Sequence, residues 1–345
     1  MNERLRIACV AVVALLFLTA ESCDSPPVIR ILTPKPGLDV TYEPLLIEID
    51  LWAFAKTREF EVLLNGVDIT SEFVFEMAGP RRQATAIDVW GPGIVHAGTN
   101  DLVVQIEQWE VSRTFSTTGD AHADEVADFV PGTGAGFGQS ELPDVVTGPP
   151  EGLGLFLGGL DVLSLGNGGV IELEFTDNVI LDGPGVDFTV FENSFLTLVL
   201  GIVGNPFAEP GRVSVSQDGS TWFIFDACST APLDPPPHPG CAGVYPTLSS
   251  AADPLSVHPS IPSETPILDL VGLSQGQLVV PEGSGGDSFD LEDVGLAWAR
   301  FVRIEDVGPG LGQAGSVGFD LDAVTAVNSG VPTDADQNGV PDAAE

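Results

Sequence analysis

The sequence predicts an all-β protein, an Ig-like sandwich followed by a larger jelly-roll-like β-sandwich. Short runs of apolar, β-branched and aromatic residues recur between turn residues, and the 3.6-residue periodicity of long helices is absent. The 40 glycines and 28 prolines supply the turns that many short strands need. Hydrophobic residues make up 43% of the chain and charged residues only 18%, so we expect a buried core.

The N-terminal segment, residues 1–22, reads as an export signal peptide. Two arginines precede an apolar run from Ile7 to Leu18, which is too short for a stable membrane span. Cys23 follows small residues and resembles the lipidated first residue of a mature lipoprotein, with residues 23–27 as a tether. Cleavage by the ordinary signal peptidase after Ser22 also fits. We therefore expect an exported protein at the outer membrane or cell surface, or a secreted one.

The four cysteines favour the lipid anchor. Cys9 leaves with the signal peptide, and Cys228 and Cys241 bracket a proline-rich loop that a disulfide could close in an oxidising compartment. Metal binding by this pair is the alternative, but no second close pair or histidine cluster accompanies it. Cys23 is then left over, which favours lipidation over a free or intermolecular thiol.

The charge balance excludes one class of partner. The chain has 50 acidic and 12 basic residues, and removal of residues 1–22 deletes two of each, so the net charge stays at -38. Such a surface repels phosphate backbones and anionic membranes, so we expect no nucleic-acid binding and no membrane contact other than the lipid anchor. Most of these charges need no role beyond keeping the protein soluble.

Residues 28–118 predict the first sandwich. They contain roughly seven short strands, which is the strand number of an Ig-like domain. The segments LLNGVDITSEF and AGTNDLVVQI resemble bacterial Ig-like and fibronectin-like modules of exported proteins. Because no chemically reactive residues cluster here, we expect this module to act as a spacer.

Residues 119–329 predict the larger sandwich. Val213–Ser216 and Trp222–Phe225 form a hairpin through Asp218 and Gly219, a dipeptide that suits tight turns. Ala299–Asp306 reads as an alternating strand. The two segments together resemble the SxDGxxW hairpin and late xRFVRI strand of discoidin-like and galactose-binding-like sandwiches.

A wider set of motifs covers nearly all of this segment. They are FVPGTGAGFGQ, SLGNGGVIELEF, DGPGVDFTVFEN, VSVSQDGSTW, GCAGV, GGDSFDLEDVGLAWARFVRI and GFDLDAV. As a set they resemble a family of poorly characterised bacterial cell-surface proteins. The resemblance implies an exported, surface-attached β-sandwich, sometimes followed by calcium-loop tails, and it implies no known reaction. The C-terminal anchor that the resemblance would add is missing, which places attachment on Cys23.

The acidic tail, residues 330–345, predicts a calcium loop. Its oxygen ligands occupy the first, third, fifth, seventh, ninth and twelfth loop positions, namely Asp334, Asp336, Asn338, the Val340 carbonyl, Asp342 and Glu345. Gly339 is sixth, where such loops turn sharply. Pro341 and the missing exit helix depart from an EF-hand, so the tail resembles a single thrombospondin type-3 or dockerin-like loop. The alternative is a frayed acidic end without an ion.

Acidic residues also cluster within the larger sandwich. These clusters are Asp182, Asp187 and Glu192; Asp287, Asp290, Glu292 and Asp293; and Asp320 and Asp322. On a strand Asp320 and Asp322 point to the same face, where they repel unless a cation or a base lies between them. Two interpretations stay open. Asp287, Asp290, Asp320 and Asp322 hold a structural calcium ion, or the carboxylates cap turns and pair with Arg300 and Arg303.

No catalytic arrangement stands out. Ser274 matches a nucleophile elbow only formally, Ser288 has its histidine in the wrong order, and the four histidines are scattered. We therefore expect a non-enzymatic, calcium-binding surface protein for display or adhesion, whose partner is an extracellular protein or a glycan. The alternative is a carbohydrate-binding module that stacks sugars on Trp222 or Trp298, unless both are core residues. A glycoside or ester hydrolase ranks third.

Overall fold

The computed structural model describes residues 29–35, 39–40, 45–52, 60–78, 81–86, 94–95, 97–107, 109–118, 120–230, 238–251, 257–308, 312–313 and 316–345. The predicted signal peptide, residues 1–22, and Cys23 lie outside these ranges. The described chain is all-β, and its helical elements are short 3-10 turns. In these ranges no helix is long and apolar enough to cross a membrane.

The described residues of the first sandwich form nine strands in two sheets. The strands are β1 (Ile29–Thr33), β2 (Asp39–Val40), β3 (Ile47–Trp52), β4 (Phe60–Leu64), β5 (Val67–Asp68), β6 (Val74–Ala78), β7 (Arg81–Ala86), β8 (Ala97–Ile106) and β9 (Trp109–Thr118), with the turn η2 (Thr70–Glu72). One sheet has the order β1-β3-β7-β6 and the other β2-β9-β8-β4-β5. This is the two-sheet strand order of an Ig domain, including the parallel pairing of β2 with the last strand, β9.

The larger sandwich is built on a five-stranded and a four-stranded sheet. The first has the order β10 (Glu125–Val130), β12 (Val170–Glu174), β21 (Phe301–Asp306), β17 (Gly211–Ser216), β18 (Phe223–Ile224). The second has the order β11 (Leu163–Ser164), β24 (Asp320–Ala326), β14 (Phe188–Glu192), β19 (Asp287–Phe289). The pairings within both sheets are antiparallel, as expected for a jelly-roll-like sandwich.

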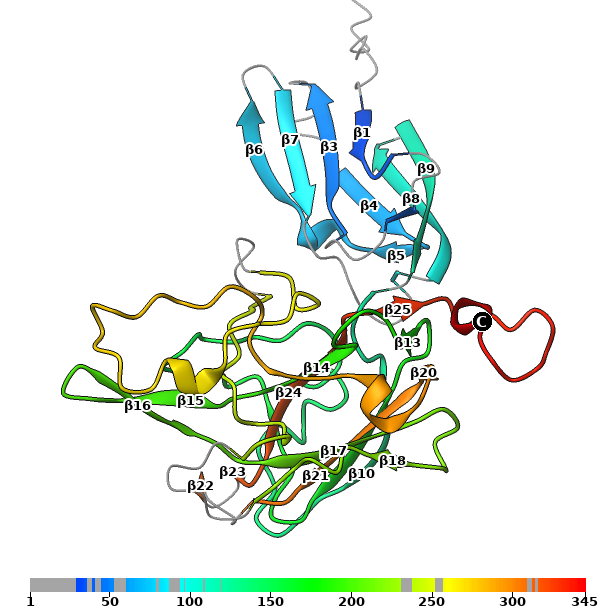
Figure 1. Cartoon of the computed structure of the whole chain (residues 1–345). Helices are drawn as coiled ribbons and strands as arrows, with labels where there is room; N and C mark the ends of the chain where they lie inside the picture. The colour runs from blue at the N-terminus through cyan, green and yellow to red at the C-terminus, as the bar shows by residue number, and fades with distance from the viewer. Residues whose placement is uncertain are drawn as a thin grey trace, which may run out of the picture.

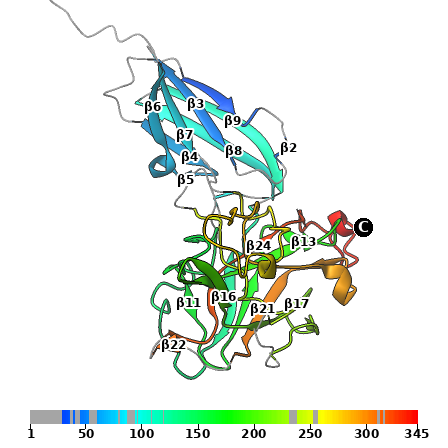
Figure 2. The same ribbon diagram turned by 60° about the vertical axis from the view of Figure 1, so that its left-hand side comes forward.

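Smaller elements complete this domain. They are the sheet β20 (Trp298–Ala299), β13 (Val179–Leu181), β25 (Ser329–Gly330); the hairpins β15 (Phe195–Val199) with β16 (Ile202–Phe207) and β22 (Gly312–Gln313) with β23 (Ser316–Val317); and the turns η3 (Ile267–Asp269), η4 (Leu291–Val294) and η5 (Asp342–Ala344). Figures 1 and 2 show the first sandwich at one end of the second, with β13 and β25 beneath it.

Each sandwich has its own hydrophobic core. Ile47, Leu64 and Phe115 belong to the first core, and side chains such as Leu173 and Phe188 belong to the second. β21 shows the alternation predicted from its sequence, because every second residue is buried. β24 differs, since all seven of its residues are buried. A strand covered on both faces cannot leave Asp320 and Asp322 on a solvated face, so these carboxylates lie inside the protein.

Two local features follow the sequence closely. The hairpin of β17 and β18 exists, and Gly219 has a φ of 70° while the Asp218 carboxylate accepts backbone hydrogen bonds from Ser220 and Thr221 at 2.8 and 2.7 Å. These bonds lower the pKa of Asp218, most strongly the one from Thr221. Cys228 and Cys241 are joined in a disulfide, with Cα atoms 4.3 Å apart.

Candidate metal centre

The tail folds into a closed loop whose side chains turn inward. Asp334 accepts hydrogen bonds from the backbone N–H groups of Asn338 at 3.0 Å and Gly339 at 2.8 Å. The Asn338 amide in turn contacts Asp336 and Glu345. Gly339 has a φ of 87°, the left-handed conformation that the sixth position of a calcium loop needs.

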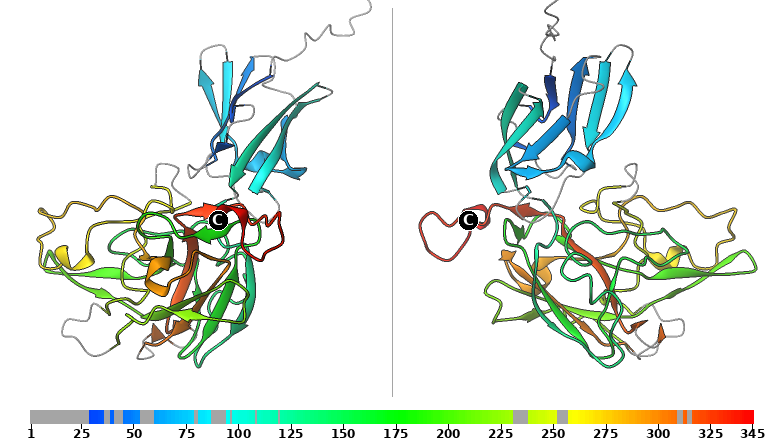
Figure 3. Two further views of the ribbon diagram at one scale, coloured as in Figure 1. Left: turned by 45° about the vertical axis from the view of Figure 1, so that its right-hand side comes forward. Right: turned by 180° about the vertical axis from the view of Figure 1, so that it is seen from behind.

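The remaining tail ligands belong to the same loop. Asp342 accepts a hydrogen bond from the backbone of Ala335 at 3.1 Å, and Val340 donates its own N–H to the Asn338 side chain at 2.7 Å. Figure 3 shows this loop projecting from the larger sandwich. The last residues of the loop form the three-residue turn η5. The predicted ligands are therefore gathered on one exposed loop.

Two carboxylate triads in the described part of the chain have oxygen atoms within 4.8 Å of one another, and neither includes a tail residue. The first comprises Asp182, Asp187 and Asp290, which the sequence had placed in two separate clusters. Asp187 is fully buried, and it accepts hydrogen bonds from Gly183, Asn328 and Leu291 at 2.7 to 2.8 Å. Burial raises the pKa of Asp187 and these donors lower it.

This first triad is therefore a structural cluster that hydrogen bonds to Asp187 hold in place. Both oxygens of Asp187 have donors, so the buried carboxylate needs no ion to satisfy it. Asp290 caps the turn η4 by accepting a hydrogen bond from the backbone of Glu292 at 2.9 Å. Turn capping was one of the two interpretations of the sequence clusters, and it fits Asp290.

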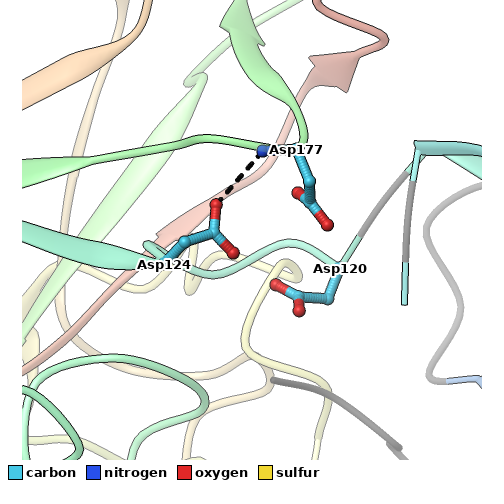
Figure 4. Close-up of side chains that lie close together, drawn as sticks. All are labelled: Asp120, Asp124 and Asp177. Carbon is cyan, nitrogen blue, oxygen red and sulfur yellow. Dashed lines mark hydrogen bonds between the residues drawn. The ribbon is translucent and has the colours of Figure 1, made fainter. Parts of the chain in front are cut away.

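The second triad, Asp120, Asp124 and Asp177, lies where the chain enters the larger sandwich. Asp120 follows β9 closely, Asp124 directly precedes β10, and Asp177 lies in the turn between β12 and β13. β10 pairs with β12, and this pairing brings the two segments together. Figure 4 shows the three carboxylates pointing toward one shared space.

The hydrogen bonds that Asp124 accepts go to one of its two carboxylate oxygens. Asp124 is 4% exposed, and its Oδ2 accepts hydrogen bonds from the backbone N–H groups of Thr176 at 2.6 Å and Asp177 at 3.4 Å. In contrast, the buried Asp177 Oδ1 has no hydrogen-bond partner. An unsatisfied buried carboxylate oxygen is costly, so this atom calls for a proton or a cation.

The raised pKa values of the triad also indicate that it needs a proton or a cation. Burial raises the pKa of Asp177 to about 9, and the charges of Asp120 and Asp124 add to the rise. Burial also raises the pKa of Asp124. Arg300 lies near the triad, because it donates a hydrogen bond to the backbone oxygen of Thr176 at 3.4 Å, but its ion pair is with Glu174 at 3.2 Å.

The chemistry of these donors suits a hard cation. Calcium takes six to eight oxygen ligands, and the triad offers carboxylate oxygens without a thiol or imidazole among them. The neighbouring Asn178 is fully buried, and its Oδ1 also has no hydrogen-bond partner. Its Nδ2 donates to the backbone oxygen of Asp120, so the amide lies against the triad. Asp120, Asp124, Asp177 and Asn178 are thus the residues that fit calcium.

The other predicted acidic residues are not gathered into one site. Asp287 accepts hydrogen bonds from the backbones of Val244 and Tyr245, and burial raises its pKa to about 7. Asp320 accepts one from the Asn193 amide at 3.3 Å, and Asp322 accepts one from the backbone of Glu151 at 3.1 Å. The set Asp287, Asp290, Asp320 and Asp322 therefore does not form one calcium site.

A second correction concerns the arginines. Arg303 pairs with Glu172 at 2.6 Å across the β12–β21 pair, and Arg300 pairs with Glu174. Both therefore neutralise glutamates of β12, and the register places Arg303 directly opposite Glu172. The interpretation in which Arg300 and Arg303 pair with Asp320 and Asp322 is wrong.

The two tryptophans proposed for sugar stacking are restricted by contacts within the protein. Trp298 is only 9% exposed and lies in the core. Trp222 carries the Arg303 guanidinium 3.8 Å above its ring centre, which covers one face. The core interpretation holds for Trp298, and Trp222 offers at most one face.

Sequence reasoning missed Asp120, Asp124 and Asp177. The available signals were weak, namely two aspartates four residues apart after the first domain and an Asp-Asn pair in a turn. Their proximity depends on the pairing of β10 with β12, which joins segments about fifty residues apart. A single sequence does not specify that pairing.

A scan against protein-family models found no match, and a search of curated proteins found none either. Solved structures of titin segments are similar to parts of this chain. Titin M4 in a trigonal form is 16% identical, with a TM-score of 0.18, over 26% of this chain and 92% of that chain. The titin I9–I11 tandem is 10% identical, with a TM-score of 0.20, over 50% of this chain and 52% of that chain.

Proposed function

We propose that this chain is an exported, calcium-binding, non-enzymatic protein of the cell surface that serves display or adhesion toward an extracellular protein or glycan. The observation that carries the calcium part is the triad Asp120, Asp124 and Asp177, with a buried oxygen that no donor satisfies. The inward-turned tail loop supports a second, weaker site. The net charge of -38 favours cations over anionic partners.

The proposed location at the cell surface has separate support. It rests on the signal-like N-terminus, on Cys23, and on the resemblance to bacterial surface proteins. Two sandwiches in a row with separate cores suit a protein that holds a binding face away from its anchor.

The test is a calorimetric calcium titration of the mature protein. We expect binding at about 0.1 to 1 mM, the range of extracellular calcium modules. Asp177→Asn should remove the triad site, and Asp334→Asn should weaken the tail site. Asp128→Asn is the matched control, because Asp128 is exposed on β10 outside both sites. Absence of calcium binding by the wild-type protein at 5 mM would refute the calcium part of the proposal.

A further inference from the structure

A pocket of about 320 Å³ opens on the larger sandwich and shares no residue with the two carboxylate triads or the tail loop. Its volume lies in the range of small-molecule pockets, roughly 300–1,000 Å³. Of the eight residues that line it, four are acidic and none is basic: Glu141, Asp144, Val145, Thr147, Pro149, Glu151, Asp161 and Ala251. The pocket therefore concentrates negative charge in a concave site.

Hydrogen bonds and core packing fix the walls of this acidic pocket. The backbone N–H of Val145 donates to the backbone oxygen of Glu141 at 3.2 Å, which closes a tight turn. Val145 is also 5% exposed and belongs to the core of the larger sandwich. The backbone N–H of Ala251 donates to the backbone oxygen of Pro150 at 2.9 Å, so two segments distant in sequence are held together. The pocket is thus preformed.

The larger sandwich supplies no base to neutralise the pocket. Residues 119–329 contain three arginines and no lysine. All three arginines pair with glutamates of the five-stranded sheet, namely Arg212 with Glu305, Arg300 with Glu174 and Arg303 with Glu172. None of these glutamates lines the pocket. A cation that neutralises the pocket must therefore come from outside this domain.

A buried carboxylate behind the pocket adds to its negative field. Asp322 of β24 is 4% exposed, and its Oδ1 accepts a hydrogen bond from the backbone N–H of the lining residue Glu151 at 3.1 Å. In the described part of the chain its Oδ2 has no hydrogen-bond partner. Burial raises the pKa of Asp322, and the charges of Asp161 and Glu151 add to the rise. Burial also raises the pKa of Asp161, as do the charges of Glu151 and Glu141. A bound cation would relieve this repulsion.

The arrangement of the carboxylates favours an extended organic cation over a single metal ion. In the described part of the chain, the two triads of carboxylate oxygens within 4.8 Å of one another include no pocket residue. Carboxylates that do not converge on one ion can still surround a guanidinium group, whose five N–H donors spread in a plane. Val145, Pro149 and Ala251 give the same pocket an apolar wall, and long cationic side chains pack their stems against such surfaces.

We propose that this pocket binds an arginine side chain of a partner protein, with the guanidinium group among the carboxylates and the stem against the apolar wall. The inference rests on the adhesion proposed above and names the chemical feature of the partner that is recognised. It commits to a protein partner over a glycan, and it does not depend on calcium binding. The net charge of -38 also attracts a positively charged partner over long range.

The test is a titration of the ¹⁵N-labelled mature protein with N-acetyl-arginine amide, followed through backbone amide chemical shifts, in EGTA and in 5 mM calcium. N-acetyl-citrulline amide is the matched neutral ligand, because it keeps the length and shape of the arginine side chain without its charge. We expect saturable shifts at Val145, Thr147 and Glu151 with the arginine ligand. The citrulline ligand should bind at least about tenfold more weakly, since hydrogen bonds between charged groups are the stronger ones.

Two variants test the contribution of the carboxylates. Asp161→Asn keeps the side-chain shape and removes one half-buried charge, and it should weaken binding of the arginine ligand by up to about tenfold. Glu151→Gln removes an exposed charge of the pocket, so it weakens binding without affecting the core. Asp128→Asn removes an exposed charge on β10 and should bind as the wild type does. Core amide shifts report whether each variant keeps the fold.

Several outcomes would overturn the inference. Equal affinity for the arginine and citrulline ligands would do so, as would shifts spread evenly over the acidic surface or unchanged affinity in both pocket variants. Tighter binding of spermidine would assign the pocket to a free polyamine, and calcium-induced shifts in the pocket would assign it to a metal ion. Calcium-induced shifts at Asp120, Asp124 and Asp177 report the proposed calcium site separately. Failure of the pocket and failure of the calcium-binding function are therefore distinguishable.

Discussion

At the scale of single residues, the larger sandwich buries carboxylates that no base neutralises. Glu192 is 1% exposed and Glu209 is 3% exposed, and each has a carboxylate oxygen without a hydrogen-bond partner. Burial raises the pKa of Glu192 well above its usual range and that of Glu209 to about 8, and the nearby Asp320 adds to both. Burial therefore favours the protonated form of both groups in the folded state.

Glu209 makes the stability of the folded protein fall as pH rises. A raised folded-state pKa means that its contribution is complete below the unfolded value near 4.5 and is lost as pH rises toward 8. In EGTA, the wild type should lose several degrees of Tm between pH 5 and pH 8.5, since one pKa unit corresponds to about 1.4 kcal/mol. Glu209→Gln cannot ionise and should lose less. The exposed Glu292→Gln is the control, and an unchanged slope in Glu209→Gln would show that Glu209 titrates normally.

Attachment also depends on one residue. Cys23 lies outside the described residues, and its lipidation stays a prediction from the signal-like N-terminus. Cys23→Ala should move the protein from the membrane fraction to the soluble fraction in its native cell type, because the thioether that would carry the lipid is lost. Ser22→Ala, one residue away, should leave attachment unchanged. Wild-type protein found soluble, with an unmodified N-terminus by mass spectrometry, contradicts the anchor.

At the scale of elements, the tail loop is an appendage of the larger sandwich. It extends beyond β25, its ligand side chains are exposed except for contacts within the loop, and it contributes no residue to the core cluster. Deletion of residues 334–345 should therefore remove one weak calcium site and shift the main melting transition by no more than a few degrees. Ordering such a loop costs chain entropy that the ion must offset.

Calorimetry and thermal melting of the truncated protein check this prediction. The matched variant is Asp334→Asn, which removes one ligand and keeps the chain length. If the truncated protein keeps every calcium site of the wild type, the tail is an acidic end without an ion. A large calcium-dependent rise in Tm after truncation would instead assign the stabilising ion to the triad Asp120, Asp124 and Asp177.

The elements also show what a single sequence specifies. Alternation predicted β21, and the Asp-Gly turn predicted the β17–β18 hairpin, because both signals are local. For β24 the pattern put Asp320 and Asp322 on one face but did not indicate that segments distant in sequence bury that face. The triad Asp120, Asp124 and Asp177 was not predicted from the sequence for a related reason, because Asp124 and Asp177 meet only through the pairing of β10 with β12. Local chemistry was predictable, whereas proximity set by long-range pairing was not.

At the scale of the whole molecule, the two largest hydrophobic clusters of the described residues lie in different sandwiches, and a smaller third cluster around Leu196 belongs to the larger domain. The first cluster draws its residues from Ile29 to Phe115 and the second from Ala123 to Ala326, so no residue belongs to both. Separate cores are the mark of domains that can fold alone. A first domain of about ninety residues is large enough to fold independently.

Residues 28–118 expressed alone should therefore unfold in one cooperative transition, at a Tm within about 4–8 °C of the corresponding transition in the full mature chain. A shift of that size corresponds to about 1 kcal/mol for a domain of this length. The Tm of the isolated first domain should not respond to calcium, because the triad residues Asp120, Asp124 and Asp177 all lie outside it. Differential scanning calorimetry of the fragment and of the full chain, each in EGTA and in calcium, makes the comparison. A fragment that is unfolded by itself would show that the first sandwich depends on the second for folding.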